Sequence, residues 1–465
     1  MKTFESIALG IPNILLPKAG TDLSRWAVIA CDQYTSDLEY WQKVRDTVGG
    51  APSALNLIYP EVYLGEENPE TRIASIREHM QKYLDEGLFD ETEGFVYVER
   101  QTGRHTRKGL LVCLDLDRYD FHKGATSLIR ATEGTILARI PPRVKIREGA
   151  PLEIPHIMVL IDDPDNTVIG PLTQNKDKLQ KLYSIELMMG SGHLSGYRVD
   201  KSSLEKGIVS ALEALADPQA FAKKYNLGTE TPVILYAMGD GNHSFATAKT
   251  IWEKTKEQAQ DKDVLKNSPL RYGLVELVNL HDEALVFEPI HRVLFDLDQG
   301  RNVLDDLMDY YPGRCRISEV SSDQEMLDAV DHQKGYPHRI GIVSPTKFGI
   351  VEVSDPDANL PAATLQIFLN DFMEKNGAKK IDYIHGTESL IRLAKKDYNL
   401  GFYLPALDKF DLFKTVILDG STPRKTFSMG EAWEKRFYME ARKLVREQSP
   451  AKKRWGLNLI LSKAS

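Results

Sequence analysis

The sequence predicts a mixed α/β protein of the α+β type, in which helices and strands alternate irregularly. Three observations indicate this class. Apolar residues recur at helical spacing in some segments and form short apolar runs in others. Both kinds of segment occur from the first quarter of the chain to the last. Some neighbouring strands are joined by short turns, which favours mixed sheets with hairpins over a pure doubly wound sheet.

The N-terminal half contains two predicted amphipathic helices and a set of strands. The helices are expected at Thr71–Glu86 and Ser203–Ala216, because apolar residues lie along one face of each. Short apolar or alternating runs bounded by turn residues predict strands at Gly94–Gln101, Lys108–Leu114 and Pro155–Ile161.

The centre of the chain has a strand–turn–helix pattern. A buried-type strand is predicted at Thr231–Met238, and a helix at Phe245–Glu257. Between them lies the turn Gly239-Asp240-Gly241-Asn242-His243-Ser244. A further strand is expected at Tyr272–Asn279.

Beyond Asp296 the predicted elements become shorter. They are helices at Val303–Tyr311, Asp323–Val330 and Leu365–Glu374, and strands at Arg314–Ser318, His338–Val343, Phe348–Val353 and Gly401–Leu404. A chain of 465 residues is too long for one compact core. We therefore expect an N-terminal α/β domain over 1–296, which carries the turn, and a C-terminal mixed α/β domain over 301–465, which contributes a basic loop.

Composition narrows the classes of function. A formal net charge of -8 makes duplex nucleic acid an unlikely main partner, because phosphate neutralisation dominates such binding. No apolar run approaches the ~20 residues of a membrane helix, and the N-terminus lacks a secretory signal, so we expect a cytoplasmic protein without membrane contact. Three widely spaced cysteines predict neither a disulfide framework nor a Cys-x-x-Cys site.

The turn Gly239–Ser244 is the strongest candidate site. Its two glycines let the backbone approach a ligand closely, and the next residues open a helix whose free N–H groups suit a phosphate. Asn242 and His243 can donate hydrogen bonds to the same oxygens, and Asp240 can hold a metal ion such as Mg²⁺. The alternative is a plain strand–helix turn that Asp240 or Asn242 caps.

Two further polar segments precede this turn. Ser191 and His193 lie in a loop with three glycines that can wrap a polar ligand, although a surface loop explains the pattern equally. Arg130 and Glu133 lie in a segment where a carboxylate among arginines can act as a base or metal ligand, or simply form solvated ion pairs; Arg139 and Arg143 follow.

Two basic segments follow the turn. His291 and Arg292 come after an expected strand at Leu285–Phe287, which would aim them into a cleft. Arg424 and Lys425 follow a Gly-Ser-Thr sequence and resemble a phosphate clamp. The chain has no P-loop, no Rossmann glycine motif, no Gly-x-Ser-x-Gly elbow and no His-Glu-x-x-His zinc motif.

These segments, taken in order, resemble a large prokaryotic family called domain of unknown function ten-fifteen, often labelled partition-protein-like. The resemblance covers roughly residues 5–445 and rests on Arg130–Thr135, on Asp240–Ala248, on Pro289–Arg292 and on Pro423–Phe427. The usual central motif of the family is Asp-Gly-His-His-Arg-Tyr. This chain has Asn242 in place of the first His and Ser244 in place of the Arg.

That motif is similar to the phosphate-binding turn of the ParB/sulfiredoxin superfamily, which includes free-serine kinases and partition CTPases. The resemblance implies a ParB/sulfiredoxin-like core that binds ATP or ADP with Mg²⁺ at Gly239–Ser244. Because Ser244 lacks a guanidinium, Arg198, Arg292 or Arg424 would have to supply that charge.

The leading hypothesis is a nucleotide-dependent phosphotransferase that acts on a small hydroxylated metabolite, with free L-serine as the best single guess. In this hypothesis Glu133, Asp240 and His243 are catalytic, while Arg130, Arg424 and Lys425 neutralise phosphoryl charge. The first alternative is a nucleotide-gated, ParB-like regulator that binds DNA or a protein. The second is a metal-dependent phosphatase built from Asp240, His243 and His193. A homodimer is left open.

Overall fold

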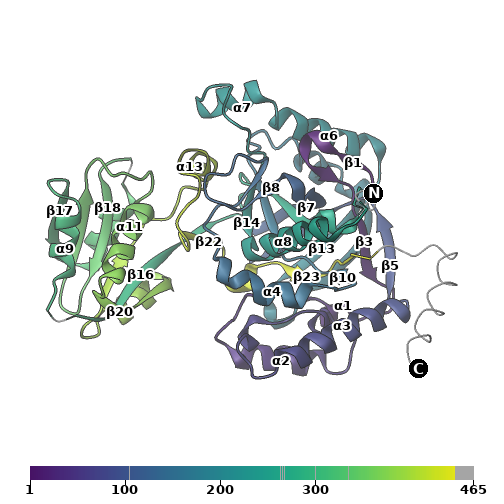
Figure 1. The fold of residues 1–465 in the computed structure, drawn as a ribbon, viewed down its shortest axis with the longest axis horizontal. Coiled ribbons are helices and arrows are strands. Elements are labelled where there is room, and N and C mark those ends of the chain that lie inside the picture. Colours follow the sequence, from purple (N-terminus) through teal and green to yellow (C-terminus); the bar gives the residue numbers. More distant parts are fainter. Residues whose placement is uncertain are drawn as a thin grey trace.

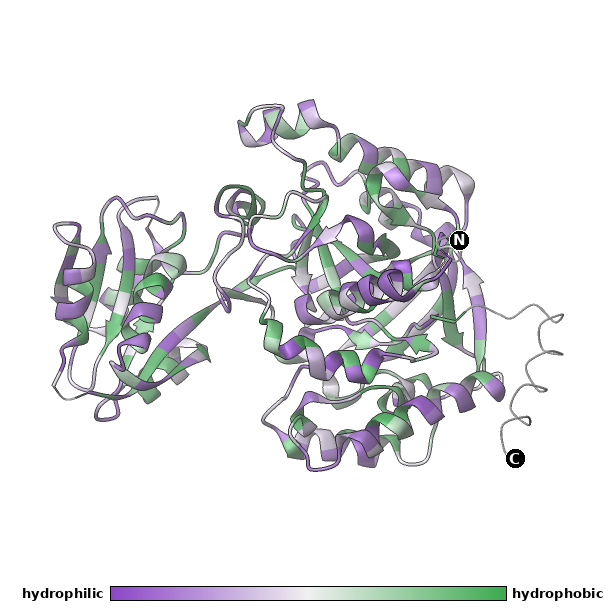
Figure 2. Ribbon diagram, in the orientation of Figure 1, coloured by the Kyte–Doolittle hydropathy of each residue, from purple (hydrophilic) through white to green (hydrophobic). Residues whose placement is uncertain are grey.

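The computed structural model describes residues 1–445, except residues 104, 262, 264, 267, 299 and 334. The helices and strands form a large body and a smaller lobe, which are connected at a narrow waist (Figure 1). Two sheets with helices packed on them confirm the expected mixed α/β class. Apolar side chains concentrate on the strands, and the outer faces of the helices are hydrophilic (Figure 2). None of the described helices has the length and apolarity needed to cross a membrane.

The body is built on a sheet that combines antiparallel and parallel pairs. Along its main path β11 is parallel to β15, and β14 is parallel to β9, whereas the remaining neighbours from β12 to β11 are antiparallel. The strands follow the order β12 (Gln180–Glu186), β13 (His193–Val199), β6 (Phe95–Thr102), β7 (His105–Asp115), β15 (Tyr272–Asn279), β11 (Met158–Ile161), β14 (Tyr236–Asp240), β9 (Ile129–Arg130) and β8 (Tyr119–Asp120).

Helices cover both faces of this sheet. The N-terminal helices α2 and α3 pack over one apolar cluster, and α6 and α8 pack over another. Their bounds are α2 (Leu38–Val48), α3 (Pro69–Asp85), α4 (Ile140–Arg147), α6 (Ser202–Leu215), α7 (Pro218–Tyr225) and α8 (Asn242–Gln258).

The lobe is built on a second, antiparallel sheet. Its path contains β17 (Cys315–Val320), β19 (Phe348–Val353), β18 (His338–Val343), β21 (Leu400–Tyr403), β16 (Phe287–Leu297) and β20 (Ala378–His385). The helices packed on it are α9 (Val303–Tyr310), α10 (Asp323–Asp331), α11 (Pro361–Glu374) and α12 (Thr387–Ala394). A further helix, α13 (Leu412–Asp419), lies between the lobe and the body (Figure 1).

Most predicted elements are confirmed. Their ends differ by a few residues at several places, as in α11, which begins at Pro361, and two strands differ in ways that matter for the site. The strand expected at Thr231–Met238 begins only at Tyr236, because the backbone pairing with β11 and β9 begins there. The strand expected to end at Phe287 instead begins there and continues to Leu297, because β20 and β21 pair along its length. His291 and Arg292 therefore lie inside a strand and not after one.

The end of the described chain returns from the lobe to the body. β22 (Phe427–Met429) pairs with β16, whereas β23 (Phe437–Tyr438) and β24 (Arg442–Lys443) pair with short strands of the body, β4 (Val28–Ile29) and β10 (Leu152–Glu153). We call residues 427–444 the returning segment. The division into domains at 296–301 stays a prediction, and residues 446–465 of the expected second domain lie outside the described part of the chain.

Buried ion pairs fix the returning segment to the body. The guanidinium of Arg436, 3% exposed, pairs with Glu276 on β15 and, at 2.6 Å from Nη2 to Oε2, with Glu440. Its Nε also donates to the carbonyl oxygen of Pro155 at 3.0 Å. Burial acts to lower the pKa of Arg436, but the neighbouring carboxylates of Glu440 and Glu276 together have the larger effect and raise it above its usual value. The side chain therefore stays charged.

We expect Arg436→Ala to lower the free energy of unfolding by about 3–5 kcal/mol, because it removes the cation paired with buried Glu440 and leaves Glu276 with the more distant Arg107, at 3.7 Å. Urea denaturation followed by tryptophan fluorescence measures this change. The matched control is Lys43→Ala, which removes an exposed partner of Glu39 and should leave the unfolding midpoint nearly unchanged. Equal effects of the two variants would contradict the structural role of Arg436.

Candidate functional site

The central turn has a backbone that only glycine accommodates. Gly241 has a φ of 79°, and a Cβ atom there would lie 3.1 Å from the Cα of Ile157. Helix α8 begins at the next residue, and its N-cap, Gly241, supplies no side-chain hydrogen bond to the helix. Phe245 and Trp252, both buried, anchor the helix to the body. The first-turn N–H groups are thus held in a fixed position and are available to an anion.

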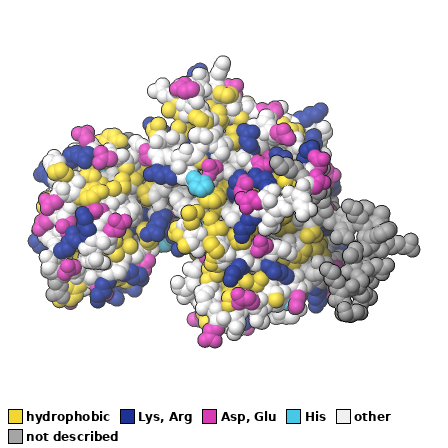
Figure 3. Space-filling view, in the orientation of Figure 1, with side chains coloured by type: hydrophobic (Ala, Val, Ile, Leu, Met, Phe, Trp, Pro, Cys, Tyr) yellow, Lys and Arg dark blue, Asp and Glu magenta, His cyan; other side chains and the backbone are white. Residues whose placement is uncertain are grey.

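This turn lines a cavity of about 770 Å³ between the body, the lobe and the returning segment. We call it the central cavity. It contains five basic and five acidic side chains, so it can hold an anion and still present carboxylates to it. The basic residues are Arg139, Arg143, Arg424, Lys425 and Lys435, and the acidic residues are Asp32, Glu61, Glu133, Asp240 and Glu431. Figure 3 shows lysine and arginine side chains beside the waist between lobe and body.

The cations reach the cavity from three separate elements. Lys435 belongs to the returning segment, and its buried Nζ lies 3.3 Å from Asp240 Oδ2. The main-chain N–H of Lys425 donates to Glu133 Oε2 at 2.7 Å, which leaves the ammonium group exposed. Arg143 comes from α4 and pairs with Glu61. The sequence did not identify Lys435 or Glu61, because neither lies in a motif.

Two carboxylates of the cavity have opposite electrostatic environments. Burial raises the pKa of Glu133, and the nearby charge of Asp240 raises it further. Burial also acts to raise the pKa of Asp32, but the imidazole of His156 holds that pKa well below its usual range. Glu133 is therefore suited to accept a proton, whereas Asp32 is suited to remain charged.

His243 is a neutral hydrogen-bond donor in this cavity. Burial lowers its pKa to about 4, and the charges of Arg143 and Arg139 contribute to this shift. Its Nε2 accepts the backbone N–H of Ile136 at 3.2 Å, so the proton of the neutral ring is on Nδ1.

Asn242 contributes an unsatisfied acceptor at the start of α8. The residue is 6% exposed, and among the described residues its Oδ1 has no hydrogen-bond partner. Leaving a buried amide oxygen without a donor costs about 1–3 kcal/mol. A ligand that donates a hydrogen bond, or a cation, would satisfy this oxygen.

Ser244 is part of a network that the sequence did not reveal. Its Oγ lies 3.2 Å from Nε2 of His156, whose Nδ1 lies 2.8 Å from the hydroxyl of Tyr438. Asp32 Oδ2 lies 3.6 Å from the same Nε2. His156 and Tyr438 are 282 positions apart in the chain, so no local pattern connects them.

Several expected site residues lie outside the central cavity. Arg130 is buried in β9, where its guanidinium donates to the carbonyl oxygens of Ser127 and Pro232 at 2.8 and 2.7 Å. His193 lies on β13 and bonds to Ser184 and Glu186.

The strand order separates the segment that contains Ser191 and His193 from the Gly239–Ser244 turn. Five inter-strand steps separate these two strands, which corresponds to about 24 Å along the sheet. Ser191 precedes β13 and does not line the central cavity either.

His291 and Arg292 support the cavity wall from behind. His291 is 1% exposed, accepts the N–H of Leu404 at 3.1 Å and stacks on Tyr403. The guanidinium of Arg292 lies 4.7 Å from the ring centroid of Tyr383, and its Nη2 is 3.4 Å from the carbonyl oxygen of Arg424. Arg292 therefore helps to position the Arg424 loop, and neither residue lines the cavity itself.

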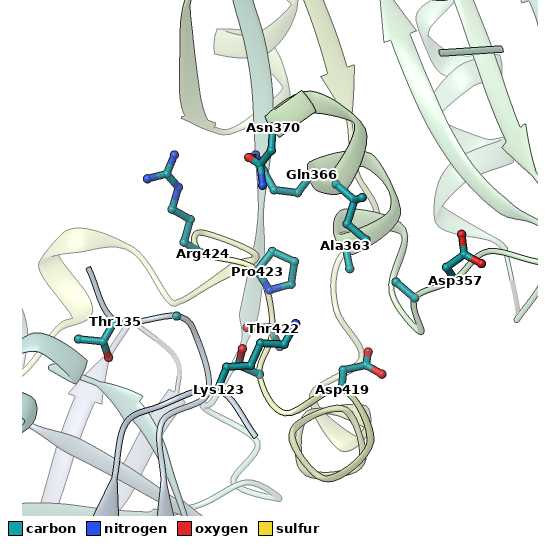
Figure 4. A pocket seen from close by; sticks show the side chains of 14 residues that line it. Lys123, Thr135, Asp357, Ala363, Gln366, Asn370, Asp419, Thr422, Pro423 and Arg424 are labelled. Carbon is teal, nitrogen blue, oxygen red and sulfur yellow. The ribbon is translucent and has the colours of Figure 1, made fainter. Parts of the chain in front are cut away.

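A second cavity, of about 640 Å³, adjoins the central one. The loop from Ser421 to Arg424 forms one wall of it, and Arg424 lines both cavities. Figure 4 shows Pro423 in the middle, with Arg424 extending away from Asp357 and Asp419. Thr422 fixes this loop to the body, since its N–H and Oγ1 both donate to the carbonyl oxygen of Thr132 at 2.7 and 2.8 Å.

Within the described residues, no group of three or more His, Cys, Asp or Glu side chains is arranged to hold a metal ion. Mg²⁺ usually takes only one or two carboxylates and completes its shell with phosphate oxygens and water. Asp240 and Asn242 supply one carboxylate and one amide oxygen at the turn, where Asp240 also accepts the N–H of Gly241 at 2.9 Å and faces Lys435 Nζ at 3.3 Å.

Comparison with known proteins identifies the family. A family model described as protein of unknown function (DUF1015) matches residues 15–371. The chain belongs to this family. A search of curated proteins gives no match.

Solved structures of three kinds are similar to this member of the family. A free serine kinase in complex with AMP is 10% identical, with a TM-score of 0.36 over 72% of this chain and 92% of the other. A conserved hypothetical protein from Pyrococcus furiosus is also 10% identical, with a TM-score of 0.35 over 72% and 95%. SbnI from Staphylococcus aureus, truncated at its C-terminus, is 10% identical, with a TM-score of 0.34 over 74% and 92%. TM-scores this low carry no conclusion about function.

In the ligand-free protein we expect His243 to titrate with a midpoint near 4, because it is buried and faces two arginines. Inorganic phosphate should raise that midpoint, since a bound anion favours the imidazolium. Nitrogen-15 spectra of histidine-labelled protein measure both values, and His243→Asn identifies the signal. A midpoint near 6.5 that does not respond to phosphate would contradict the geometry.

Proposed function

We propose that this protein is a nucleotide-dependent phosphotransferase that phosphorylates a hydroxyl group of a small metabolite in the central cavity. The observation that carries the proposal is the uncapped N-terminus of α8, which opens into a cavity with five cations and five carboxylates. Phosphoryl transfer requires mainly positioning and charge neutralisation, and both are available there.

The donor phosphates bind at the Gly239–Ser244 turn in this proposal. The N–H groups of the first turn of α8 contact the phosphate oxygens, and the dipole of the helix favours their charge. Lys425, Arg424 and Arg143 neutralise the remaining charge from the opposite walls. His243 donates a hydrogen bond from Nδ1, and Ser244 adds a hydroxyl in place of the family's arginine.

The acceptor hydroxyl loses its proton to Glu133. The oxygen of the acceptor hydroxyl then forms a bond to the terminal phosphorus of the nucleotide. The bond from that phosphorus to the bridging oxygen breaks, and the shortened nucleotide leaves with that oxygen. The raised pKa of Glu133 makes this carboxylate the better base, while Asp32 remains charged and orients the acceptor. A Mg²⁺ ion held by Asp240 and Asn242 would neutralise phosphate charge.

Neither alternative function has a specific observation in its favour. The metal-dependent phosphatase needs His193 beside Asp240 and His243. His193 lies on β13, five strands away from β14, which carries Asp240 and leads into the helix that carries His243. A DNA-binding regulator needs a basic face, whereas the basic residues of the central cavity are matched in number by acidic ones.

We expect ATP or ADP with Mg²⁺ to raise the melting temperature of the protein, because the nucleotide binds only the folded state. The same mixtures, incubated with L-serine first and then with a panel of small alcohols, should yield a phosphorylated product visible by phosphorus-31 NMR. The absence of both a thermal shift with either nucleotide and turnover of any pair would contradict the proposal.

Glu133→Gln should lower kcat by about 100-fold while KM for the nucleotide changes little, because it removes the base and leaves the phosphate contacts. Steady-state kinetics separate the two constants. The matched control is Glu388→Gln, an exposed position on α12 of the lobe, which should keep full activity. Equal rates for the two variants would exclude Glu133 as the base.

A further inference from the structure

A third cavity lies directly behind the first turn of α8. It has a volume of about 130 Å³ and is lined mainly by buried apolar side chains. We call it the apolar chamber. Its apolar walls come from Leu57, Ile58, Tyr59, Met80, Ile146, Ala150, Leu152, Ile154, Pro155 and Ile157. An engineered apolar cavity of about 150 Å³ binds benzene, so this volume suits one ring or a branched chain of similar size.

The chamber adjoins the central cavity. Glu61, Leu64, Arg143 and Ser244 line both of them. Arg143 and Glu61 form an ion pair within this shared boundary. A molecule bound at the start of α8 can therefore place one group in each space.

The polar groups around the chamber are already satisfied by one another. The carboxylate of Glu153 accepts from Arg442 Nε at 2.6 Å and from the N–H of Leu274 at 3.1 Å. His156 lies between Ser244 and Tyr438. Within the described residues, no buried side-chain nitrogen or oxygen of the chamber lacks a partner. The chamber thus has room for an apolar group beside its ten apolar wall residues, and the side chains of Glu153 and His156 are engaged with other partners.

On the side of the central cavity, the start of α8 has a polar atom that is available to a hydrogen-bond donor. There Asn242 Oδ1, at the first position of α8, is buried and has no donor among the residues that the structure describes. Ser244, two residues later, borders the chamber. The two spaces together match a molecule with a hydrogen-bond donor at one end and a compact apolar arm at the other.

We propose that the metabolite bound in the central cavity is an amphipathic alcohol, whose apolar arm, no larger than a single ring, occupies the apolar chamber. This inference rests on the proposed function, because it places the hydroxyl group beside the phosphate site. It predicts that free L-serine, which has no apolar arm, is a poor acceptor compared with alcohols that carry a short branched or aromatic group.

Calorimetric binding of phenyl phosphate and of inorganic phosphate to the full chain tests the chamber. Both probes have a phosphate group that is expected to bind at the start of α8, but only phenyl phosphate has an apolar ring that can enter the chamber. We expect phenyl phosphate to bind at least 10-fold more tightly. Ala150→Leu, which fills the chamber, should abolish that difference and leave the affinity for inorganic phosphate within about twofold. Ala214→Leu, on the exposed face of α6, is the matched control and should keep the difference.

A second variant enlarges the chamber in case Ala150→Leu does not fold. Met80→Ala should improve the binding of 1-naphthyl phosphate at least 10-fold relative to the unaltered protein, because it removes a side chain from the chamber wall. Equal affinity of the unaltered protein for phenyl phosphate and inorganic phosphate would contradict the proposal that an apolar arm occupies the chamber, but it would not contradict the phosphate site. Binding of neither probe would overturn the proposed function and this inference together.

Discussion

The buried guanidinium of Arg436 is the interaction on which the arrangement of the central cavity depends. It lies between Glu440 and Glu276 on the body sheet, and Glu276 also faces Arg107 at 3.7 Å, so the return of the chain to the body completes a buried cluster of two cations and two carboxylates. That return carries Lys435 to a position 3.3 Å from Asp240, and it carries Tyr438 to His156. A wall of the site is therefore made by residues that follow the lobe in sequence.

The effect of burial on charge also explains why we propose different roles for two carboxylates, Glu133 as the base and Asp32 as a group that stays charged. Both carboxylates line one cavity, and burial acts to raise the pKa of each. An imidazole lies beside Asp32, whereas the strongest hydrogen bond to Glu133 comes from a neutral backbone N–H. Two groups of the same type thus acquire different chemical properties from their neighbours alone.

Local patterns in the sequence predicted the elements well, because periodicity and turn residues act over a few positions. The bounds of β15, β18 and β19 agree with the expected strands, and the glycine turn precedes α8 as expected. The same reasoning selected Glu133, Arg424 and Lys425, which the structure places in the central cavity with the turn.

Local sequence patterns could not predict which residues from distant parts of the chain lie close together in the fold. Ser191 and His193 belong to a glycine-rich polar segment of the sequence, but the strand order places them several strands away from the central turn. Asp32 and His156 lie in segments without glycine-rich or basic motifs, and only the fold brings them together. Burial also reversed expectations for Arg130 and Arg292, whose guanidinium groups bond mainly to backbone carbonyls, to Gln366 and to an aromatic ring.

The small side chain of Ser244 has a structural consequence for the central cavity. Ser244 is part of the boundary between the central cavity and the apolar chamber. An arginine side chain there would add a cation and fill much of that boundary. The chain instead supplies its cations from α4, from the 421–425 loop and from the returning segment, where they face the turn from other directions. Moving the positive charge to these elements leaves the space beside the helix start open, and the small hydroxyl of Ser244 remains bonded to His156.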